Sequence, residues 1–442
     1  MGSSPTFPKV DLPMMTTATT FGRGALRGRV RVPGDKSISH RALLFGAVSR
    51  GTTVISNANR GADVRATREA LAAMGIHIQH WAGRDNGATL VVTGGTLRDP
   101  VQVIDCLNSG STARMLMGLI AGVGVRAQFT GDESLQRRPM ERVAVPLRTI
   151  GATIETTNGR LPATIAGVRN PAGGTFALSV PSAQVKSAIL LAHLNATGIV
   201  KITGDNFSRD HTERMLQRFG AEVAWDGQTV VFEPRPLIGT EIEVPGDISA
   251  AAFFFVAASI VPGSDLVVER IGVNPTRTGI IDALRAMGAS ITYENYIEVG
   301  GEPIADVRVV AAPLTGTSIS GALVSRMIDE LPVFGVAAAF ASTPSVVSGA
   351  EELRQKESDR IATLAALLRA VGADIEERPD GFAVTPADLH EATAPVASAG
   401  DHRIAMSAAV LAAGTGNIHV DDATPIAISF PDFQEIWTTA QS

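Results

Sequence analysis

A short pattern that recurs five times along the chain limits the folds open to it. Each time, a glycine ends an apolar helical pattern and precedes a short β-branched run, at intervals of about 70 to 85 residues. A glycine in that place is typical of a helix C-terminus that leads into a strand. The pattern predicts a repeated α/β unit, longer than the repeats of ordinary solenoids. Its occurrences are Met74-Gly75-Ile76, Ile150-Gly151-Ala152, Phe219-Gly220-Ala221, Met287-Gly288-Ala289 and Val371-Gly372-Ala373.

A second pattern opens each unit, where a small polar or charged start leads into an Ala/Leu-rich helix. Six such starts predict six units of the βαβαββ type, the sixth without the glycine because the chain ends soon afterwards. At 442 residues the chain exceeds what one core usually supports, so we expect two domains of three units each. The starts lie near Gly34, Asn108, Pro181, Gly246, Asp329 and Asp401.

Composition and charge narrow the class of protein. The formal net charge of -6 argues against a nucleic-acid partner, which would require a basic surplus. A single cysteine, Cys106, excludes an internal disulfide framework and a cysteine-based metal site, and favours a reducing compartment such as the cytoplasm. No apolar run is long enough to span a membrane, and the histidines are too scattered to suggest a metal site. We interpret residues 1–23 as a disordered extension, with a tag remnant or a weak transit peptide as alternatives.

The unit starts carry the chemistry. Gly34-Asp35-Lys36-Ser37-Ile38-Ser39-His40-Arg41 combines a turn, hydroxyls and two cations where a long apolar helix begins. Unpaired backbone N–H groups and the helix dipole favour an anion at such a place. If the starts from both domains meet in one cleft, that cleft is electropositive without a basic net charge. Two acids among the cations, Asp329 and Glu357, would then have pKa values that their neighbours can tune for proton transfer.

Several stretches resemble one enzyme family over nearly the whole length, from about Gly24 to the C-terminus. That family is 5-enolpyruvylshikimate-3-phosphate synthase, and two of the stretches resemble its bacterial class II branch. The class II stretches are Asn274-Pro275-Thr276-Arg277-Thr278-Gly279 and Ser208-Arg209-Asp210-His211-Thr212-Glu213. The others are Pro33-Gly34-Asp35-Lys36-Ser37-Ile38-Ser39-His40-Arg41, Gln355-Lys356-Glu357-Ser358-Asp359-Arg360 and Asp401-His402-Arg403-Ile404-Ala405-Met406.

The resemblance implies a reaction and an architecture. The enolpyruvyl group of phosphoenolpyruvate passes to the 5-hydroxyl of shikimate 3-phosphate and phosphate is released, without metal or organic cofactor. The fold implied is the enolpyruvyl transferase fold, an inside-out α/β barrel of two similar domains that close over the substrates. Residues 24–34 with 246–442 would form one domain and residues 35–245 the other, with the active site in the cleft between them. Relatives suggest a monomer.

Residue roles follow from the resemblance, position by position. Asp329 and Lys36 would handle the proton of the 5-hydroxyl, and Glu357 would exchange a proton at C3. Shikimate 3-phosphate would contact Lys36, Ser37, Arg41, Ser182, Ala183, Gln184, Arg209, Asp329 and Lys356. Phosphoenolpyruvate would contact Lys36, Gly110, Arg138, Gln184, Arg360 and Arg403. Arginine forks suit its carboxylate and phosphate oxygens.

Two positions depart from the broader family, and two rival functions remain. Ile428 stands where many relatives carry a lysine. Gly110 leaves open the space that alanine fills in glyphosate-resistant class II enzymes, so we expect glyphosate to inhibit this protein. The first rival is the sister enzyme that acts on UDP-N-acetylglucosamine, although Cys106 is not in its mobile loop. The second is a catalytically silent phosphometabolite-binding protein, which would not need Asp329 and Glu357.

Overall fold

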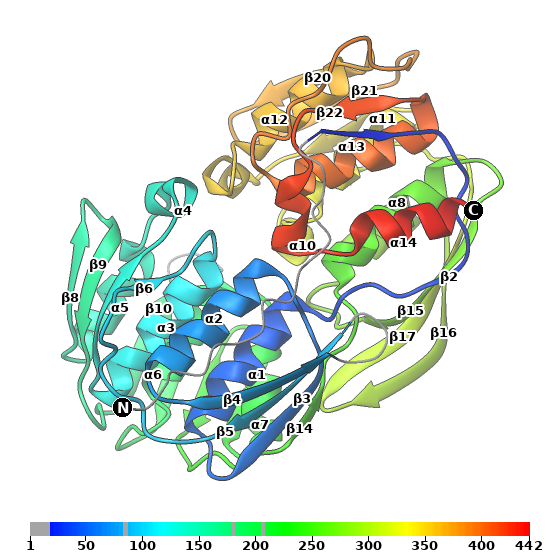
Figure 1. Cartoon of the computed structure of the whole chain (residues 1–442). Coiled ribbons are helices and arrows are strands. Elements are labelled where there is room, and N and C mark those ends of the chain that lie inside the picture. Colours follow the sequence, from blue (N-terminus) through cyan, green and yellow to red (C-terminus); the bar gives the residue numbers. More distant parts are fainter. Residues whose placement is uncertain (1–17, 83–86, 179–181, 205–207) are drawn as a thin grey trace, which may run out of the picture.

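The protein consists of two lobes, at the lower left and upper right of Figure 1. The computed structural model describes residues 18–82, 87–178, 182–204 and 208–442. The lower lobe comprises the described residues between 35 and 245, and the upper lobe comprises 18–34 and 246–442. Each has its own buried apolar cluster, which draws on residues 38–244 in the lower lobe and on 21–32 and 248–440 in the upper lobe. The expected domain boundaries stay a prediction that this division of the core supports.

Within the described residues, five four-stranded sheets share one topology. In each sheet the first strand runs parallel to the second, and the other two strands are antiparallel to their neighbours. The lower lobe holds β14(Glu241–Glu243)-β3(Thr52–Ala58)-β5(Ala88–Thr93)-β4(His77–Ala82), β6(Ile104–Asp105)-β7(Arg126–Thr130)-β9(Arg160–Ala166)-β8(Thr153–Thr157) and β10(Gly174–Leu178)-β11(Val200–Gly204)-β13(Val230–Glu233)-β12(Glu222–Trp225). The upper lobe holds β2(Arg27–Val30)-β15(Asp265–Gly272)-β17(Glu302–Val310)-β16(Ser290–Val299) and β18(Ser318–Ile319)-β19(Ser345–Val347)-β21(Gly381–Thr385)-β20(Asp374–Arg378). These repeats confirm the predicted α/β fold.

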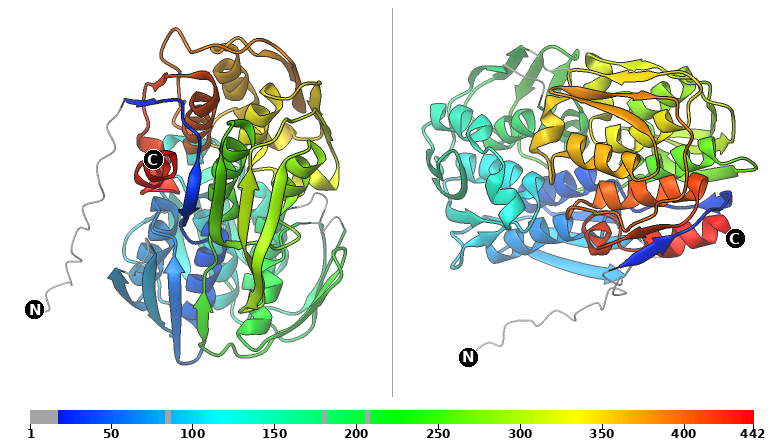
Figure 2. Two further views of the ribbon diagram at one scale, coloured as in Figure 1. Left: turned by 90° about the vertical axis from the view of Figure 1, so that its right-hand side faces the viewer. Right: turned by 90° about the horizontal axis from the view of Figure 1, so that it is seen from above.

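Three largely buried helices run through the centre of each lobe, with the sheets outside them (Figures 1 and 2). The helix α8 shows why, since ISAAAFFFVAASI is apolar on every side and must be buried all round. Shorter helices cover the remaining faces. The central helices are α1(Lys36–Val48), α3(Gly110–Val123) and α6(Ala183–Ala192) in the lower lobe, and α8(Ile248–Ile260), α11(Leu331–Ala339) and α13(His402–Thr415) in the upper lobe. The others are α2(Ala62–Ala73), α4(Glu133–Arg137), α5(Glu141–Thr149), α7(His211–Arg218), α9(Gly279–Ala286), α10(Ala322–Met327), α12(Arg360–Arg369), α14(Phe433–Gln441) and the 3-10 helices η1(Glu351–Gln355) and η2(Thr424–Ile428).

The five recurring glycines adopt the conformation that the sequence predicts. All have positive φ, between 84° and 97°, which favours glycine over residues with a side chain. Each lies between a helix and the strand that follows it, at the starts of β4, β8, β12, β16 and β20. Five of the predicted unit starts fall at the first turn of a central helix or just before it, whereas Pro181 lies outside the described residues. The glycines concerned are Gly75, Gly151, Gly220, Gly288 and Gly372.

The chain crosses between the lobes twice, through the same tetrapeptide. Val-Pro-Gly-Asp stands at 32–35, between β2 and α1, and again at 244–247, between β14 and α8. The crossovers pair with each other, because the N–H of Asp35 donates to the Pro245 carbonyl and that of Asp247 to the Pro33 carbonyl, at 2.7 and 2.8 Å. Gly34 must be glycine, since a Cβ would lie 1.8 Å from the Asn57 carbonyl oxygen. Each crossover leads from the sheets of one lobe to a central helix of the other.

The sixth unit is built differently from the other five. Its sheet pairs β22(Ile418–Val420) with β1(Thr19–Phe21), and Val396 forms a parallel bridge to Val420. The strand β1 thus supplies a position that the other units fill from their own C-terminal hairpins. The interpretation of residues 1–23 as disordered is therefore wrong for Thr19–Phe21, and residues 1–17 lie outside the described residues. The helix α14 packs beside β2, so the two ends of the described chain run close together (Figure 2).

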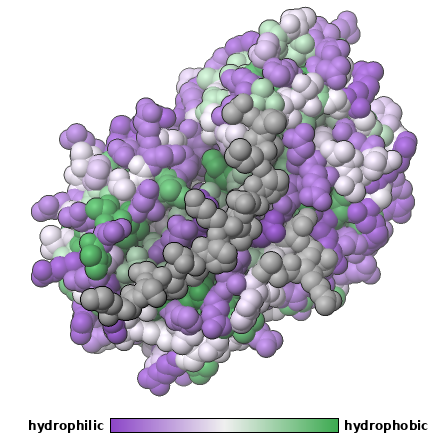
Figure 3. All heavy atoms as spheres, in the orientation of Figure 1, coloured by the Kyte–Doolittle hydropathy of each residue, from purple (hydrophilic) through white to green (hydrophobic). Residues whose placement is uncertain are grey.

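No helix within the described ranges is long and apolar enough to cross a membrane. On the face drawn in Figure 3, hydrophilic side chains dominate and the apolar ones form small separate patches.

Candidate active site

A cavity of about 520 Å³ lies between the lobes, at the starts of central helices from both. The residues that open α1, α3 and α6 face it from the lower lobe, and those that open α8 and α13 face it from the upper lobe. Helix starts present unpaired N–H groups and positive dipole ends, so the cavity suits anions. The sequence-predicted residues that line it are Lys36, Ser37, Arg41, Gly110, Arg138, Ser182, Ala183, Gln184, Arg209, Asp329, Lys356 and Arg403.

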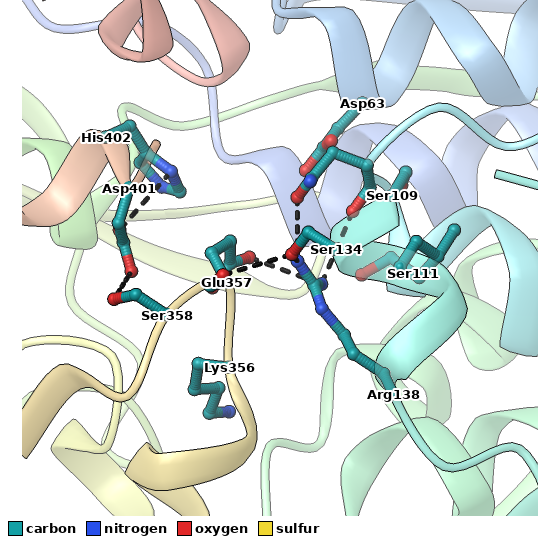
Figure 4. Close-up of polar contacts among 12 residues, drawn as sticks. Asp63, Ser109, Ser111, Ser134, Arg138, Lys356, Glu357, Ser358, Asp401 and His402 are labelled. Carbon is teal, nitrogen blue, oxygen red and sulfur yellow. Dashed lines mark hydrogen bonds and ion pairs between the residues drawn. The ribbon is translucent and has the colours of Figure 1, made fainter. Parts of the chain in front are cut away.

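Two predicted residues, Glu357 and Arg360, contact the lining instead of forming part of it. Arg360 is buried at the start of α12; its Nη2 donates to Glu357 Oε2 at 2.5 Å, and its Nη1 is 3.5 Å from Asp329 Oδ1. Figure 4 shows Glu357 between Arg138 and the Asp401–His402 pair. Its Oε1 lies 3.4 Å from Arg138 Nη1. The structure thus brings every predicted site residue to the cavity or to a side chain that lines it.

The lower-lobe cations are held in place by neutral and acidic partners. Lys36 Nζ donates to Asp63 Oδ2 at 2.7 Å. Arg41 donates to the Thr212 and Ser187 hydroxyls at 2.7 and 2.8 Å, and burial lowers its pKa to about 10. Since neutral hydroxyls hold Arg41, its positive charge remains available to a bound anion.

The two acids proposed for proton transfer are ionised in this arrangement. Burial opposes the charge of Asp329, but Lys356 and then Arg209 outweigh burial and hold its pKa well below the usual range. Burial likewise opposes the charge of Glu357, and Arg360 and Arg138 hold its pKa well below the usual range. Both carboxylates therefore depend on cations that a negatively charged substrate would also attract.

Three ion pairs beside the cavity join a cation of the lower lobe to an acid of the upper lobe. At the crossovers the polarity is reversed, because Arg277 of the upper lobe pairs with Asp35 of the lower lobe. Arg209 Nη2 meets Asp329 Oδ2 at 2.6 Å, Arg138 meets Glu357, and Arg142 Nη1 lies 3.4 Å from Glu352 Oε1. A further contact joins α4 to the loop before α12, since the Ser134 hydroxyl donates to the Glu357 carbonyl at 3.0 Å (Figure 4).

A buried histidine stands next to each side of the cavity. Burial and then Arg403 lower the pKa of His402 to about 3, and burial and then Lys36 lower that of His40 well below its usual value. Both are neutral at pH 7. The His40 Nδ1 forms a hydrogen bond with the Thr67 hydroxyl at 2.8 Å, and this bond holds the ring inside the lower lobe.

Sequence reasoning assigned no role to several residues that line the cavity. Arg114 hydrogen-bonds Gln184 Oε1 at 2.7 Å, and burial and then Arg142 lower its pKa to about 9. The spacing from Gly110 to Arg114 is one helical turn and places both on one face of α3, a relation that the sequence already contained. The second Val-Pro-Gly-Asp could have drawn attention to Asp247. The polar side chains among them are Ser111, Arg114, Arg142, Ser208, Asp247, Ser249, Arg277, Ser325, Glu351, Glu352 and Gln355.

Two positions noted in the sequence lie away from the cavity. Cys106 is buried, and burial raises the pKa of its thiol. Ile428 ends η2 and is not part of the cavity lining. Within the described ranges, no group of three or more His, Cys, Asp or Glu residues could hold a metal ion.

Solved structures identify the class of fold. A crystal structure of the enolpyruvyl transferase NikO from Streptomyces tendae superposes with a TM-score of 0.76 over 96% of this chain and 97% of that one, at 17% identity. This likeness concerns the fold alone, which is that of the enolpyruvyl transferases.

Closer relatives narrow the class to one family. The profile of EPSP synthase (3-phosphoshikimate 1-carboxyvinyltransferase) matches residues 21–437. The 3-phosphoshikimate 1-carboxyvinyltransferase of Geotalea uraniireducens is 48% identical over 426 residues, covering 95% of this chain and 98% of that protein. The EPSP synthase from Acinetobacter baumannii superposes with a TM-score of 0.83 at 41% identity, over 96% and 98% of the two chains. The chain belongs to the EPSP synthase family, and its activity is that of a 3-phosphoshikimate 1-carboxyvinyltransferase of the shikimate pathway.

Proposed function

We propose that the cavity binds shikimate 3-phosphate and phosphoenolpyruvate side by side and that residues from both lobes carry out the transfer. The observation that carries this proposal is the set of cross-cleft ion pairs, in which lower-lobe cations meet upper-lobe acids around one cavity. Both substrates are polyanions, so they would compete with the acids for these cations. The transfer also needs proton donors and acceptors, which the acids would supply.

The shikimate 3-phosphate site is assigned to the side of the cavity near α1, α6 and Asp329. Arg209 would bind the phosphate, and Asp329 and Lys356 the ring hydroxyls. Arg209 and Asp329 are in contact at 2.6 Å. This contact supports the assignment of both residues to one subsite, because the phosphate and the hydroxyls are carried by the same ring of shikimate 3-phosphate. The remaining contacts are Lys36, Ser37, Arg41, Ser182, Ala183 and Gln184.

The phosphoenolpyruvate site is assigned to the opposite side, around the start of α3. Arg138, Arg360 and Arg403 would hold the carboxylate and phosphate as planar forks, with Lys36, Gly110 and Gln184 completing the contacts. Gln184 donates to the Ser111 hydroxyl at 3.1 Å and so stands between the starts of α3 and α6. This position supports its proposed contact with both substrates.

The proposed chemistry depends on how substrate binding changes the pKa values of Asp329 and Glu357. The 5-hydroxyl oxygen attacks C2 while its proton passes to Asp329, assisted by Lys36, and C3 gains a proton from the protonated form of Glu357. The bond from C2 to the phosphate oxygen then breaks, the leaving phosphate takes the proton held by Asp329, and C3 returns its proton to the Glu357 carboxylate. Without substrate, nearby cations hold both carboxylates ionised. When substrate anions draw on Arg209, Arg138 and Arg360, the pKa values of Asp329 and Glu357 rise toward the range that proton transfer needs.

The test is phosphate release from purified protein with both substrates, compared with controls that omit each one. We expect release to require both, and Asp329→Ala to lower kcat about 100-fold because the base is gone. Near-normal turnover of a folded Asp329→Ala protein would contradict the assigned role. Release with UDP-N-acetylglucosamine instead of shikimate 3-phosphate would favour the sister enzyme, although the burial of Cys106 argues against a reactive loop cysteine. Binding without turnover would favour a silent binder.

Three finer assignments belong to the same proposal. The class II branch rests on the stretches at 208–213 and 274–279. A monomer would sediment as a single 46.1 kDa species. The single, buried thiol suits a cytoplasmic enzyme, and cell fractionation tests that assignment.

A further inference from the structure

Arg277 lies beneath the cavity, where the two crossovers meet. It belongs to the loop between β15 and α9 of the upper lobe, and its residue surface is only 2% exposed. Its Nη1 donates to Asp35 Oδ2 at 3.0 Å, while its Nη2 donates to the Ser249 hydroxyl at 2.9 Å and lies 3.4 Å from Asp247 Oδ1. One guanidinium thus contacts both crossovers.

The two acids that Arg277 holds start the central helices of opposite lobes. Asp35 Oδ1 accepts from the Ile38 N–H at 2.9 Å at the start of α1, and Asp247 Oδ1 accepts from the Ser249 N–H at 2.8 Å at the start of α8. Asp247 Oδ2 also accepts the backbone N–H of Lys36 at 3.1 Å. Movement of this carboxylate would therefore move Lys36, the first residue of α1, together with its ammonium group.

Two more hydrogen-bonded routes lead from Arg277 to the site. The Ser249 hydroxyl bonds to the buried Glu330, the residue after Asp329. On the other side, Arg277 Nη1 lies 3.4 Å from His211 Nε2, and the other ring nitrogen of His211 bonds to Glu302 at 2.7 Å. His211 is two residues from Arg209, so the three routes end beside Lys36, Asp329 and Arg209.

We propose that Arg277 is a positioning residue of the transferase reaction, which fixes the starts of α1 and α8 relative to each other and with them Lys36 and Asp329. This inference rests on the roles proposed above for those two residues. A planar guanidinium can bridge two carboxylates and a hydroxyl at once, whereas a lysine ammonium offers no such fork. Burial would lower the pKa of Arg277, but Asp35 and Asp247 more than offset this effect and raise it, so the guanidinium stays charged.

Steady-state kinetics of the full chain test the proposal, with Arg277→Lys as the variant and Arg326→Lys as its matched control. Arg326 supports the same loop, but its hydrogen bonds go to Pro275, Thr278 and Asp282. We expect Arg277→Lys to lower kcat about 30-fold while both KM values stay within about threefold, because misplaced groups slow the chemistry more than they weaken binding. The control should keep kcat within about twofold. A folded Arg277→Lys with kcat within about threefold of wild type would overturn the inference.

A second variant keeps the test decisive if Arg277→Lys does not fold. Asp247→Asn keeps one oxygen acceptor, replaces the other with an amide NH₂ group and removes the charge that Arg277 holds, and we expect kcat to fall about tenfold. Where both variants fold, the double variant should be no more than about threefold slower than the worse single one, since both act through one contact. Wild-type turnover of Asp247→Asn, or fully additive losses, would overturn the proposal. Normal turnover of Asp329→Ala would instead count against the roles assigned to the site.

Discussion

The two sides of the cleft are built alike but carry different charges. Each lobe presents the starts of central helices, yet in the three pairs beside the cavity the cations come from the lower lobe and the acids from the upper lobe. The lower lobe holds Arg41 with neutral hydroxyls, whereas the upper lobe ties Arg360 to Asp401 and Glu357. With the roles proposed above, the lower lobe would mainly bind anions and the upper lobe would also move protons.

The same contrast explains how the cleft can hold so many buried charges. An unpaired buried ion is costly, and each lobe lowers that cost by using the other as its counter-ion. Substrate anions can replace the upper-lobe acids as partners of the lower-lobe cations. Binding would then release the acids for proton transfer without leaving a cation unpaired.

The largest expected effect concerns Glu357, which we compare with Glu352, a more exposed acid of the upper lobe. Glu357→Gln should lower kcat about 100-fold with little change in KM, because the group that exchanges the proton at C3 is gone. Glu352→Gln removes the acid of the more exposed cross-cleft pair, and its kcat should stay within about threefold of wild type. Deuterium uptake from D₂O into the C3 methylene, followed by mass spectrometry, reports the proton step directly.

Equal losses in the two variants would contradict the division of work. In that case the acids would serve as counter-ions that shape the cleft, and deuterium uptake would fall only in proportion to substrate binding.

A smaller effect concerns the neutral histidine on the upper side. The pKa of His402 falls from 6.5 to about 3 on folding, so the unfolded chain takes up a proton first as the pH drops. Stability is thus lost as the pH falls below about 6.5, at roughly 1.4 kcal/mol per pH unit for this group. His402→Gln removes this loss, so between pH 7 and pH 5 the variant should lose about 2 kcal/mol less stability than wild type in urea titrations. His77→Gln, at an exposed position of β4, is the matched control for the replacement of a histidine by glutamine.

Much of this architecture was predictable because local rules set it. The glycines at Gly75, Gly151, Gly220, Gly288 and Gly372 occupy positive φ, which few other residues tolerate, and the repeat count followed from them. The apolar pattern of α8 likewise fixed its central place. The pairing of β1 with β22 in the sixth unit escaped prediction because the two strands are distant in sequence, and three-residue strands carry almost no periodic signal.

At the site, the sequence predicted the residue types at the helix starts but not how they pair across the lobes. The contacts of Arg209 with Asp329 and of Arg277 with both crossovers join residues far apart in the chain. No local pattern encodes such a contact. The pairing of lower-lobe cations with upper-lobe acids beside the cavity is therefore seen only in the folded structure.

The smallest expected effect concerns Gly110, and it tests whether the lower lobe distinguishes phosphoenolpyruvate from glyphosate. A methyl group at Gly110 would lie 2.8 Å from Arg114 Nη1 and 3.5 Å from Arg138 Nη1, so the flexible end of Arg114 must shift and the cavity narrows. Gly110→Ala should raise the inhibitory concentration of glyphosate about tenfold, while the KM for phosphoenolpyruvate rises less than about threefold. Val123→Ala, at the far end of α3 and outside the cavity lining, should leave glyphosate inhibition unchanged. If Gly110→Ala instead slowed deuterium uptake at C3 without changing inhibition, the methyl would be acting on proton transfer, and the separation of roles between the lobes would fail.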